Sequence, residues 1–270
     1  MHEILRHLPE GSRVLDLGSR GGSFDATQYP LRIVRLDLDT HHQATMSDFV
    51  QADAASLPFS SHLFDAVIAN HSLEHFERLD DAFRELGRVA KREGSLYIAV
   101  PDASTFADRL YRWLSSGGGH VNAFRSQKDL IAQTEHYTGL RFQAGRVLMT
   151  SLAALNRANR TAPAPRKLAL LGGGREGALR LWSVISRLSD RWLGTRLSVY
   201  GWALYFGGLT EEVDHRPWSN ICVRCGTGSS SDWLLSSNQL RRRWLLKAYI
   251  CQECGAWNVF TRDNAYANLR

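Results

Sequence analysis

The segment His71-Ser72-Leu73-Glu74-His75 brings two imidazoles and a carboxylate together within five residues. These side chains can accept protons or bind metal ions near neutral pH. Their spacing, H-x-x-E-H, also occurs in one group of metallopeptidases. A zinc peptidase helix is therefore one hypothesis, and the elements around the segment have to decide it.

All four cysteines of the chain fall in two C-x-x-C segments, each followed by a glycine: Cys222 with Cys225, and Cys251 with Cys254. Two such turns can bring four thiolates to one tetrahedral metal ion, which leaves no open position for catalysis. We therefore predict a small zinc ribbon with structural Zn2+. An iron site and a pair of disulfides are the alternatives, and a reducing cytosol disfavours the disulfides. Because so small a module has little core, the metal should supply much of its folding free energy.

Strands and helices alternate over the first hundred residues. Short apolar runs closed by polar or turn residues predict strands over residues 13–18, 32–39, 48–54, 64–70 and 94–101. Apolar residues at helical spacing from Leu79 to Val89 predict a helix that stops at Gly94, and a later run over 197–208 predicts a closing strand. The pattern predicts an α/β fold with a Rossmann-like, mostly parallel sheet flanked by helices. Ligands of such sheets bind at the carboxyl ends of the strands.

The turn after the first predicted strand combines Asp16 with Gly18 and Gly22. Glycines at such a turn let the backbone approach a ligand closely and adopt dihedral angles closed to other residues. The dinucleotide pattern G-x-G-x-x-G is not met, because Arg20 and Ser23 stand where its second and third glycines would be. An NAD site is therefore not predicted.

Five motifs resemble, in order and spacing, those of the class I S-adenosylmethionine-dependent methyltransferases that act on small molecules. They are V-L-D-x-G, L-D, D-A-x-x-L-P-F, F-D-x-V and L-E-H, beginning here at Val14, Leu36, Asp53, Phe64 and Leu73. The resemblance is strong over residues 11 to about 101 and weaker to about 208. It implies S-adenosylmethionine as cofactor, with its methionine end at Asp16, Gly18, Ser19, Arg20 and Gly22, its ribose at Asp37, its adenine at Asp53 and Ala54, its sulfonium near Asn70, and Leu38 also in the site.

The sequence departs from the family pattern in two places. Arg20 replaces the middle glycine of the turn, and its side chain either points at the cofactor carboxylate or points outward. The connection from Asp37 to the third strand is short, which leaves little room for the usual helix. These departures bear on the walls of the cofactor site more than on the fold.

The same resemblance places the L-E-H motif just after the fourth strand, at the start of a helix beside the reacting methyl group. This context argues against a peptidase helix. His75 or His71 could act as general base for a hydroxyl acceptor. Alternatively, Glu74 and His75 could hold a divalent ion, as in similar ubiquinone-type O-methyltransferases, where a further acid stands at the place of His71. His75 could also simply cap or pack the helix. Methyl transfer is an in-line displacement by an already activated donor, so a base is optional.

Residues 103–197 are expected to form a substrate-covering segment and a helical insertion. By resemblance, His120 and Tyr111 are candidates for contacts to the methyl acceptor, with Tyr111 and Trp113 as core aromatics in the alternative. The insertion contains a helix that sets one apolar face apart from its arginines. This face packs on its own domain, forms a lid, or lies at a membrane interface. It consists of Leu181, Val184, Ile185, Leu188 and Trp192.

Charge is distributed unevenly along the chain. Residues 1–150 carry 16 Lys/Arg against 19 Asp/Glu, whereas residues 151–270 carry 17 against 8 and seven of the eight Trp. A basic, Trp-rich half suggests an anionic partner, and the segment Arg241–Trp244 with Trp233 and Trp257 suits stacking on single-stranded nucleic acid. The alternative is a solvated Arg-rich face. No N-P-P-Y or D-P-P-Y follows the fourth strand, which weakens a nucleic-acid or protein-glutamine substrate.

Together these features predict a methyltransferase domain over residues 1–210 and a zinc-ribbon-like module over residues 215–265. The expected function is methyl transfer from S-adenosylmethionine to a small-molecule acceptor, for example a saccharide or a lipid-linked intermediate. The alternatives are an RNA methyltransferase that uses the basic ribbon to hold RNA, and a non-catalytic cofactor-binding protein. The first residues have no apolar core typical of a signal peptide, so the expected location is the cytoplasm.

Overall fold

The computed structural model describes residues 1–19, 22–39, 48–114, 119–149, 152–157, 166–208, 220–224, 228–243 and 246–262. Contacts divide the chain into two compact units, each assembled from segments far apart in the sequence. The first unit comprises Met1–Pro101, Gly119–Gly145 and Trp202–His215, and the second comprises Asp102–Gly118, Arg146–Gly201 and Arg216–Arg270. The domain boundaries at 1–210 and 215–265 stay a prediction.

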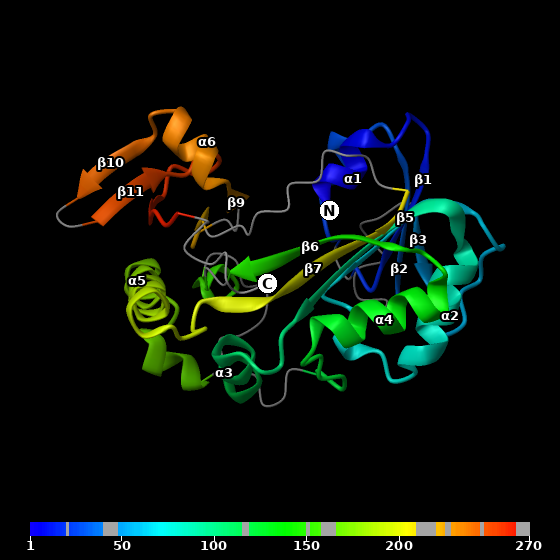
Figure 1. Cartoon of the computed structure of the whole chain (residues 1–270), viewed down its shortest axis with the longest axis horizontal. Coiled ribbons are helices and arrows are strands. Elements are labelled where there is room, and N and C mark those ends of the chain that lie inside the picture. Colours follow the sequence, from blue (N-terminus) through cyan, green and yellow to red (C-terminus); the bar gives the residue numbers. More distant parts are fainter. Residues whose placement is uncertain are drawn as a thin grey trace. The chain divides into compact units, whose positions relative to one another are not determined.

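A seven-stranded sheet has the strand order β3-β2-β1-β4-β5-β7-β6 (Figure 1). β1 pairs in parallel with β2 and β4, β2 with β3, and β4 with β5. Parallel strands are covered on both faces, and accordingly Val14, Leu15 and Val67 are fully buried. The predicted α/β sheet is confirmed. Its strands are β1 (Arg13–Leu17), β2 (Arg32–Asp37), β3 (Phe49–Gln51), β4 (Phe64–Asn70), β5 (Ala90–Pro101), β6 (Phe142–Met149) and β7 (Val199–Gly207).

Two helices of the first unit, α2 (Leu79–Val89) and α4 (Gln127–Thr138), pack against each other. Gly87 sets their approach, because a Cβ atom there would lie 2.6 Å from the Cα of Thr138. Phe83 stacks on Tyr137 beside this contact, with ring centroids 6.3 Å apart. Among the described residues of this unit, the remaining helical elements are α1 (His2–His7) and the 3-10 turns η1 (Ala26–Gln28) and η3 (Leu73–His75).

Several predicted boundaries are wrong. The helix predicted to run to Gly94 ends at Val89, because Ala90 is extended (φ −70°, ψ 142°) and pairs with Phe64 in the sheet. Gly94 lies inside β5, where a Cβ atom would come within 3.0 Å of the carbonyl oxygen of Lys91. The L-E-H motif forms the separate turn η3 rather than the first turn of α2. β6 and α4 lie in a region for which no strand or helix is predicted from the sequence.

The second unit contains helical elements and a cysteine-bearing module. One small core joins Leu114, Leu168 and Leu171. Its helical elements, within the described ranges, are α3 (Phe106–Leu114), η4 (Ala153–Leu155), η6 (Arg166–Leu171), α5 (Glu176–Leu193) and α6 (Ser231–Ser236). The strands are β8 (Asn220–Ile221) paired with β9 (Gly228–Ser229), and the antiparallel set β10 (Leu240–Arg243), β11 (Leu246–Ile250) and β12 (Trp257–Val259).

Helix α5 leaves three of the five residues of its predicted apolar face exposed. The apolar face that the sequence places on one side includes Leu181, Ile185 and Trp192, and these side chains are exposed. The buried residues of the helix are Leu179 and three polar ones, Ser183, Arg187 and Asp190. Across the part of the chain that the structure describes, no helix has the length and apolar character needed to cross a bilayer.

Candidate functional site

The turn after β1 requires glycine at two positions. Gly18 has φ +65°, donates its N–H to the carbonyl of Leu36 at 2.7 Å, and would place a Cβ only 2.5 Å from the Cβ of Ser72. Gly22 has φ +102°, and a Cβ there would lie 2.9 Å from the guanidinium of Arg35. Both φ values belong to the region that favours glycine. The turn after β1 is therefore tightly enclosed by η3 on one side and by β2 on the other.

Asp16 is a fully buried carboxylate at this turn. Its Oδ2 accepts a hydrogen bond from the N–H of Ser23 at 2.9 Å, and the Nε of Arg35 lies 3.8 Å away. Burial raises the pKa of Asp16, and the hydrogen bonds from Ser23 and the charge of Arg35 oppose this rise. Oδ1 has no hydrogen-bond partner among the described residues. The carboxylate therefore keeps an open acceptor for a ligand donor.

Other buried side-chain oxygens near this turn also lack a hydrogen-bond partner among the described residues. Within the described ranges, Ser19 Oγ, Ser72 Oγ and Glu74 Oε2 also have no hydrogen-bond partner. Each such group costs about 1–3 kcal/mol if it stays unsatisfied. Ser19 belongs to the turn itself, and Ser72 contacts it through Gly18. A polar ligand at the turn would satisfy these atoms.

Asp37 closes β2, next to the turn. Its Oδ1 accepts the N–H of Asp39 at 3.0 Å, which orients the carboxylate at the end of the strand. The carbonyl of the following residue, Leu38, accepts a hydrogen bond from Gln51 of β3 at 3.1 Å. This bond holds the Leu38 backbone while its side chain stays 67% exposed, so an apolar surface remains available beside Asp37.

The remaining residues assigned to the cofactor follow β3 and β4. Asp53 accepts the N–H of Ala55 at 2.8 Å and pairs with Arg78 at 2.9 Å, and both interactions lower its pKa. Ala54 is buried, and Asn70 is the last residue of β4, opposite Ala99 in β5. Parallel strands bring these ends to one edge of the sheet. Arg20 lies outside the described residues.

A second group of side chains gathers around η3. The Nδ1 of His75 lies 2.9 Å from the carbonyl oxygen of Gly119. A carbonyl can only accept, so Nδ1 carries the hydrogen and, in the neutral ring, Nε2 keeps its lone pair. The rings of His75 and His120 meet edge to face at 4.9 Å. The N–H groups of Val121 and Asn122 donate to the carbonyl of Glu74, at 2.8 and 3.0 Å, and fix this loop on η3.

His71 joins the group from a left-handed backbone position, with φ +55°. Its Nδ1 lies 3.7 Å from Oε1 of Glu74, whose side chain is buried. His71 and His75 do not share a helix, so the arrangement differs from the peptidase helix suggested by H-x-x-E-H. Ligand atoms of Glu74, His75 and His120 all lie within 4.8 Å of one another. Two of the three predicted histidines, His75 and His120, are thus brought together with Glu74, and His71 lies near them through its approach to Glu74.

The aromatic candidates of α3 belong to the second unit, whereas His120 belongs to the first. Trp113 is exposed rather than in the core, and the ammonium of Lys167 lies 4.9 Å from the centre of its ring. Tyr111 is half-buried. The contact of Tyr111 or His120 with an acceptor stays a prediction.

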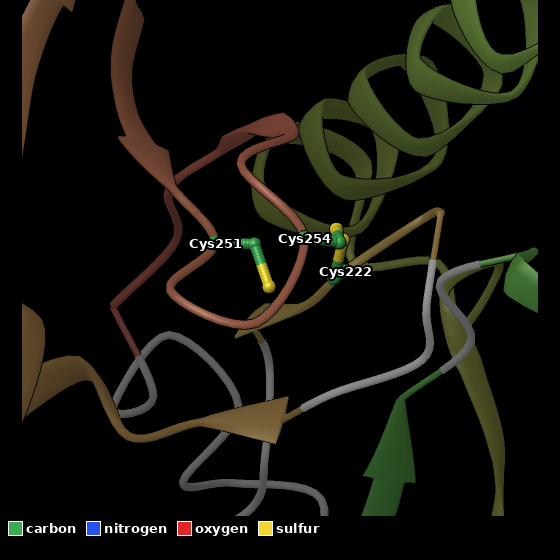
Figure 2. A group of neighbouring side chains, drawn as sticks. All are labelled: Cys222, Cys251 and Cys254. Carbon is green, nitrogen blue, oxygen red and sulfur yellow. The ribbon is translucent and has the colours of Figure 1, made fainter.

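The predicted metal ligands form a second site. The sulfur atoms of Cys222, Cys251 and Cys254 lie within 4.8 Å of one another (Figure 2). The sulfurs of Cys222 and Cys254 are 3.6 Å apart. A disulfide would require about 2.05 Å, whereas thiolates at about 2.3 Å from one tetrahedral zinc lie about 3.8 Å apart. The spacing therefore fits shared metal ligands. Cys225 lies outside the described residues.

Backbone and side-chain donors support these sulfurs. Cys222 Sγ accepts the N–H of Arg224 at 3.4 Å and the side-chain amide of Asn258 at 3.3 Å. Gly255, with φ +70°, donates to the carbonyl of Cys251 at 2.9 Å and closes the second knuckle. Donors of this kind stabilise negative charge on a thiolate. The glycine after each C-x-x-C was the sequence feature that indicated such a turn.

The aromatic and basic residues considered as contacts to nucleic acid differ from one another in their exposure. The ring of Trp257 is covered by the guanidinium of Arg180, 4.3 Å from its centre. Arg241 and Arg242 are exposed on β10, and Trp233 on α6 is 39% exposed. Trp244 lies outside the described residues. One of the predicted stacking rings is therefore already occupied by an internal contact.

This chain is similar in sequence and in fold to known methyltransferases. Residues 11–98 match a family described as a methyltransferase domain. A malonyl-[acyl-carrier protein] O-methyltransferase of Methylococcus capsulatus is 29% identical over 61% of this chain and 69% of that protein. The same enzyme of Legionella pneumophila is 33% identical over 44% of this chain, which spans only 46% of that relative. The structure of a putative methyltransferase from Bacillus halodurans, 16% identical, covers 76% of this chain and 95% of its own with a TM-score of 0.50, which speaks for the fold alone.

These findings support an S-adenosylmethionine-dependent methyltransferase of class I. The residues of the β1 turn fit that cofactor, because its amino-acid end carries an ammonium and a carboxylate that suit the open acceptor of Asp16 and the hydroxyls of Ser19 and Ser72. Sequence reasoning missed Ser72 and Gly119. Ser72 directly precedes the L-E-H motif, but only the fold shows that it contacts Gly18. Gly119 could not be found from its residue type, because it acts through its backbone carbonyl.

Proposed function

We propose that this chain transfers a methyl group from S-adenosylmethionine to an oxygen atom of a small-molecule acceptor, with His75 as general base when that oxygen belongs to a hydroxyl. A saccharide or a lipid-linked intermediate would offer such a hydroxyl. The relatives from Methylococcus and Legionella are named as O-methyltransferases, which supports oxygen as the acceptor atom. The single observation that carries the proposal is the hydrogen bond from His75 to Gly119 at 2.9 Å.

The cofactor supplies a methyl group on a sulfonium, already activated for displacement. Asp16, Ser19 and the glycine turn would hold its amino-acid end, and Asp37 the ribose hydroxyls. Leu38, Asp53 and Ala54 would line the adenine, and Asn70 would lie near the sulfonium. Because the turn is enclosed by Ser72 and Arg35, it would hold this end of the ligand with little freedom. Fixed orientation is the larger part of catalysis in such a displacement.

His75 is set up for one proton transfer. Its Nδ1–H is held by Gly119, so the lone pair of Nε2 is available to take the acceptor's hydroxyl proton. As that proton moves to Nε2, the acceptor oxygen bonds to the methyl carbon, and the carbon–sulfur bond breaks with its electrons returning to sulfur. The products are the methyl ether, S-adenosylhomocysteine and a protonated His75. A positioned base of this kind contributes about 10²–10⁴-fold in rate.

The test compares His75→Ala with His62→Ala. His62 is a matched control, because its Nδ1 also bonds a backbone carbonyl, that of Ala90, at 3.0 Å, but it stands outside the η3 group. Turnover is measured with methyl-labelled S-adenosylmethionine on a panel of hydroxyl and carboxyl acceptors. We expect His75→Ala to lower kcat on a hydroxyl acceptor about 10²–10⁴-fold while S-adenosylhomocysteine still binds. Equal rates for the two variants would contradict a base role.

A divalent ion at Glu74, His75 and His120 is the alternative use of the same group. The buried Glu74 Oε2, without a partner among the described residues, and the close spacing of the three side chains favour it. Dependence of turnover on added Mg2+ or Mn2+ would separate this role from proton transfer.

We infer further that Cys222, Cys225, Cys251 and Cys254 hold a structural zinc ion. The 3.6 Å sulfur separation and the N–H donors to Cys222 support this. A site with four thiolates leaves no position for a substrate, so the zinc would stabilise the fold of its module. The cysteine-bearing module is linked to α5 by Arg224, whose guanidinium donates hydrogen bonds to both carboxylate oxygens of Glu176, at 2.8 and 3.2 Å.

A further inference from the structure

Helix α5 exposes the residues that a helix normally buries. Leu181 is 59% exposed, Ile185 44%, Trp192 73% and Leu193 76%. With Trp182, at 39%, these side chains occupy an arc about 120° wide at 3.6 residues per turn. We call this arc, Leu181, Trp182, Ile185, Trp192 and Leu193, the apolar face of α5. Along the helix its members form two groups, Leu181, Trp182 and Ile185 in one and Trp192 with Leu193 at the end, and the polar Ser189 lies in the arc between them.

The opposite side of α5 is held in place by polar bonds. Arg187 is buried and donates to the carbonyl of Val259 at 3.0 Å and to the hydroxyl of Thr261 at 3.2 Å. Asp190 accepts the backbone N–H groups of Leu197 at 2.6 Å and Ser198 at 2.9 Å. Turning the helix over would leave these buried charges without partners, at a cost of several kcal/mol. The exposure of the apolar face is therefore a fixed property of the second unit.

Charge identifies the kind of surface that this face suits. Both acids of α5 are engaged internally, Asp190 as above and Glu176 by Arg180 and Arg224, so the exposed charges at the helix are arginines, Arg175 and Arg191. The whole second unit carries 20 Lys/Arg against 7 Asp/Glu. Two copies of so basic a unit would repel each other face to face, whereas an anionic surface would attract it.

We propose that the apolar face of α5 binds the surface of an anionic lipid bilayer. Exposed Trp and Leu beside arginines on a helix too polar to span a bilayer are the composition of a helix that lies in the interface, with its apolar side among the acyl chains. Trp192 and Leu193, the most exposed of the set, insert deepest. This binding goes beyond methyl transfer and does not depend on which acceptor is used.

The experiment measures binding of the full chain to vesicles of phosphatidylglycerol and phosphatidylcholine by co-sedimentation. The variant Trp192→Ala with Leu193→Ala removes the deepest part of the face and keeps a good helix former at both positions. Its matched control is Trp233→Ala with Leu235→Ala, the same residue pair on α6 of the same unit, each 39% exposed. Circular dichroism and the melting temperature of both variants establish that they fold.

We expect the wild type to bind anionic vesicles at least tenfold more tightly than pure phosphatidylcholine, and the α5 variant to lose at least tenfold in the partition coefficient. The control should lose less than twofold, and quenching by brominated lipids should report Trp insertion in the wild type and not in the α5 variant. Failure of the wild type to bind vesicles overturns the proposal. So does equal loss in both variants, or a wild-type dimer that only the α5 substitutions dissociate, since the face would then be covered by a second copy.

Discussion

Replacing Gly18 by alanine tests the enclosed turn on which the cofactor site rests. Two costs add at this position. An L-residue at φ +65° costs about 1–2 kcal/mol. The new Cβ would also lie 2.5 Å from the Cβ of the buried Ser72, an atom fixed to the backbone that cannot swing aside, and such overpacking costs about 1–3 kcal/mol. We therefore expect Gly18→Ala to lower the free energy of unfolding by about 2–5 kcal/mol.

Gly11→Ala is the matched control. Gly11 has a similar φ of +77°, but an added Cβ there meets no atom within 4 Å, so only the backbone cost of about 1–2 kcal/mol remains. Urea denaturation of the two variants separates the backbone cost from the cost of overpacking against Ser72. Adding Ser72→Gly to Gly18→Ala removes the clashing atom and should recover about 1–3 kcal/mol in a double-mutant cycle. Calorimetry with S-adenosylhomocysteine should show lost binding for Gly18→Ala alone. Equal destabilisation by Gly18→Ala and Gly11→Ala, or no recovery with Ser72→Gly, would refute the packing of η3 on the turn.

Three further predictions follow from the buried carboxylates and the cysteines. Burial raises the pKa of Asp16, so its contribution to stability is complete below the unfolded pKa and is lost as pH rises through the folded one. In urea titrations at pH 7, Asp16→Asn should therefore be at least as stable as the wild type, and this difference in stability should shrink as the pH is lowered. The same variant should bind S-adenosylhomocysteine about tenfold to a hundredfold more weakly. A stable variant with unchanged affinity would contradict a cofactor site at Asp16. The purified chain should contain one zinc by mass spectrometry, and Cys251→Ala should lose it and lower the melting temperature, whereas zinc retained by this variant would exclude the thiolate site. Finally, brief EDTA treatment should leave turnover on a hydroxyl acceptor unchanged if His75 is the base; loss that Mg2+ restores would assign Glu74 to an ion instead.

The central sheet was predictable because burial leaves a direct trace in the sequence. β1 and β4 are short apolar runs bounded by polar residues, and both were placed within a residue of their observed ends. β6 was missed because its burial pattern is irregular, with Arg146 buried among apolar neighbours. The stop of α2 was placed at Gly94, the obvious breaker, although pairing of Ala90 with Phe64 ends the helix earlier. Tertiary pairing overrode the local preference.

Contacts between residues that are far apart in the sequence were the part of the site that could not be predicted. The motif gave His71, Glu74 and His75, but the carbonyl of Gly119 that fixes the His75 ring comes from a loop 44 residues away. Helix α5 shows a related difficulty. Its apolar stripe left packing on its own domain, a lid and a membrane interface open, and the structure buries the polar side instead. Arg187 bonds the carbonyl of Val259, 72 residues away, and Asp190 accepts the N–H of Ser198, eight residues away. Pattern alone cannot tell which face a helix buries when buried ion and hydrogen-bond partners are distant in sequence.

Calorimetric titration of S-adenosylhomocysteine into the wild type and into Asp37→Ala tests whether the cofactor binds at the ends of β1 and β2. We predict one binding site per chain, and an affinity at least tenfold weaker when the carboxylate at the end of β2 is removed. Absence of binding to the wild type, or the same affinity for Asp37→Ala, would contradict a cofactor held at the ends of β1 and β2.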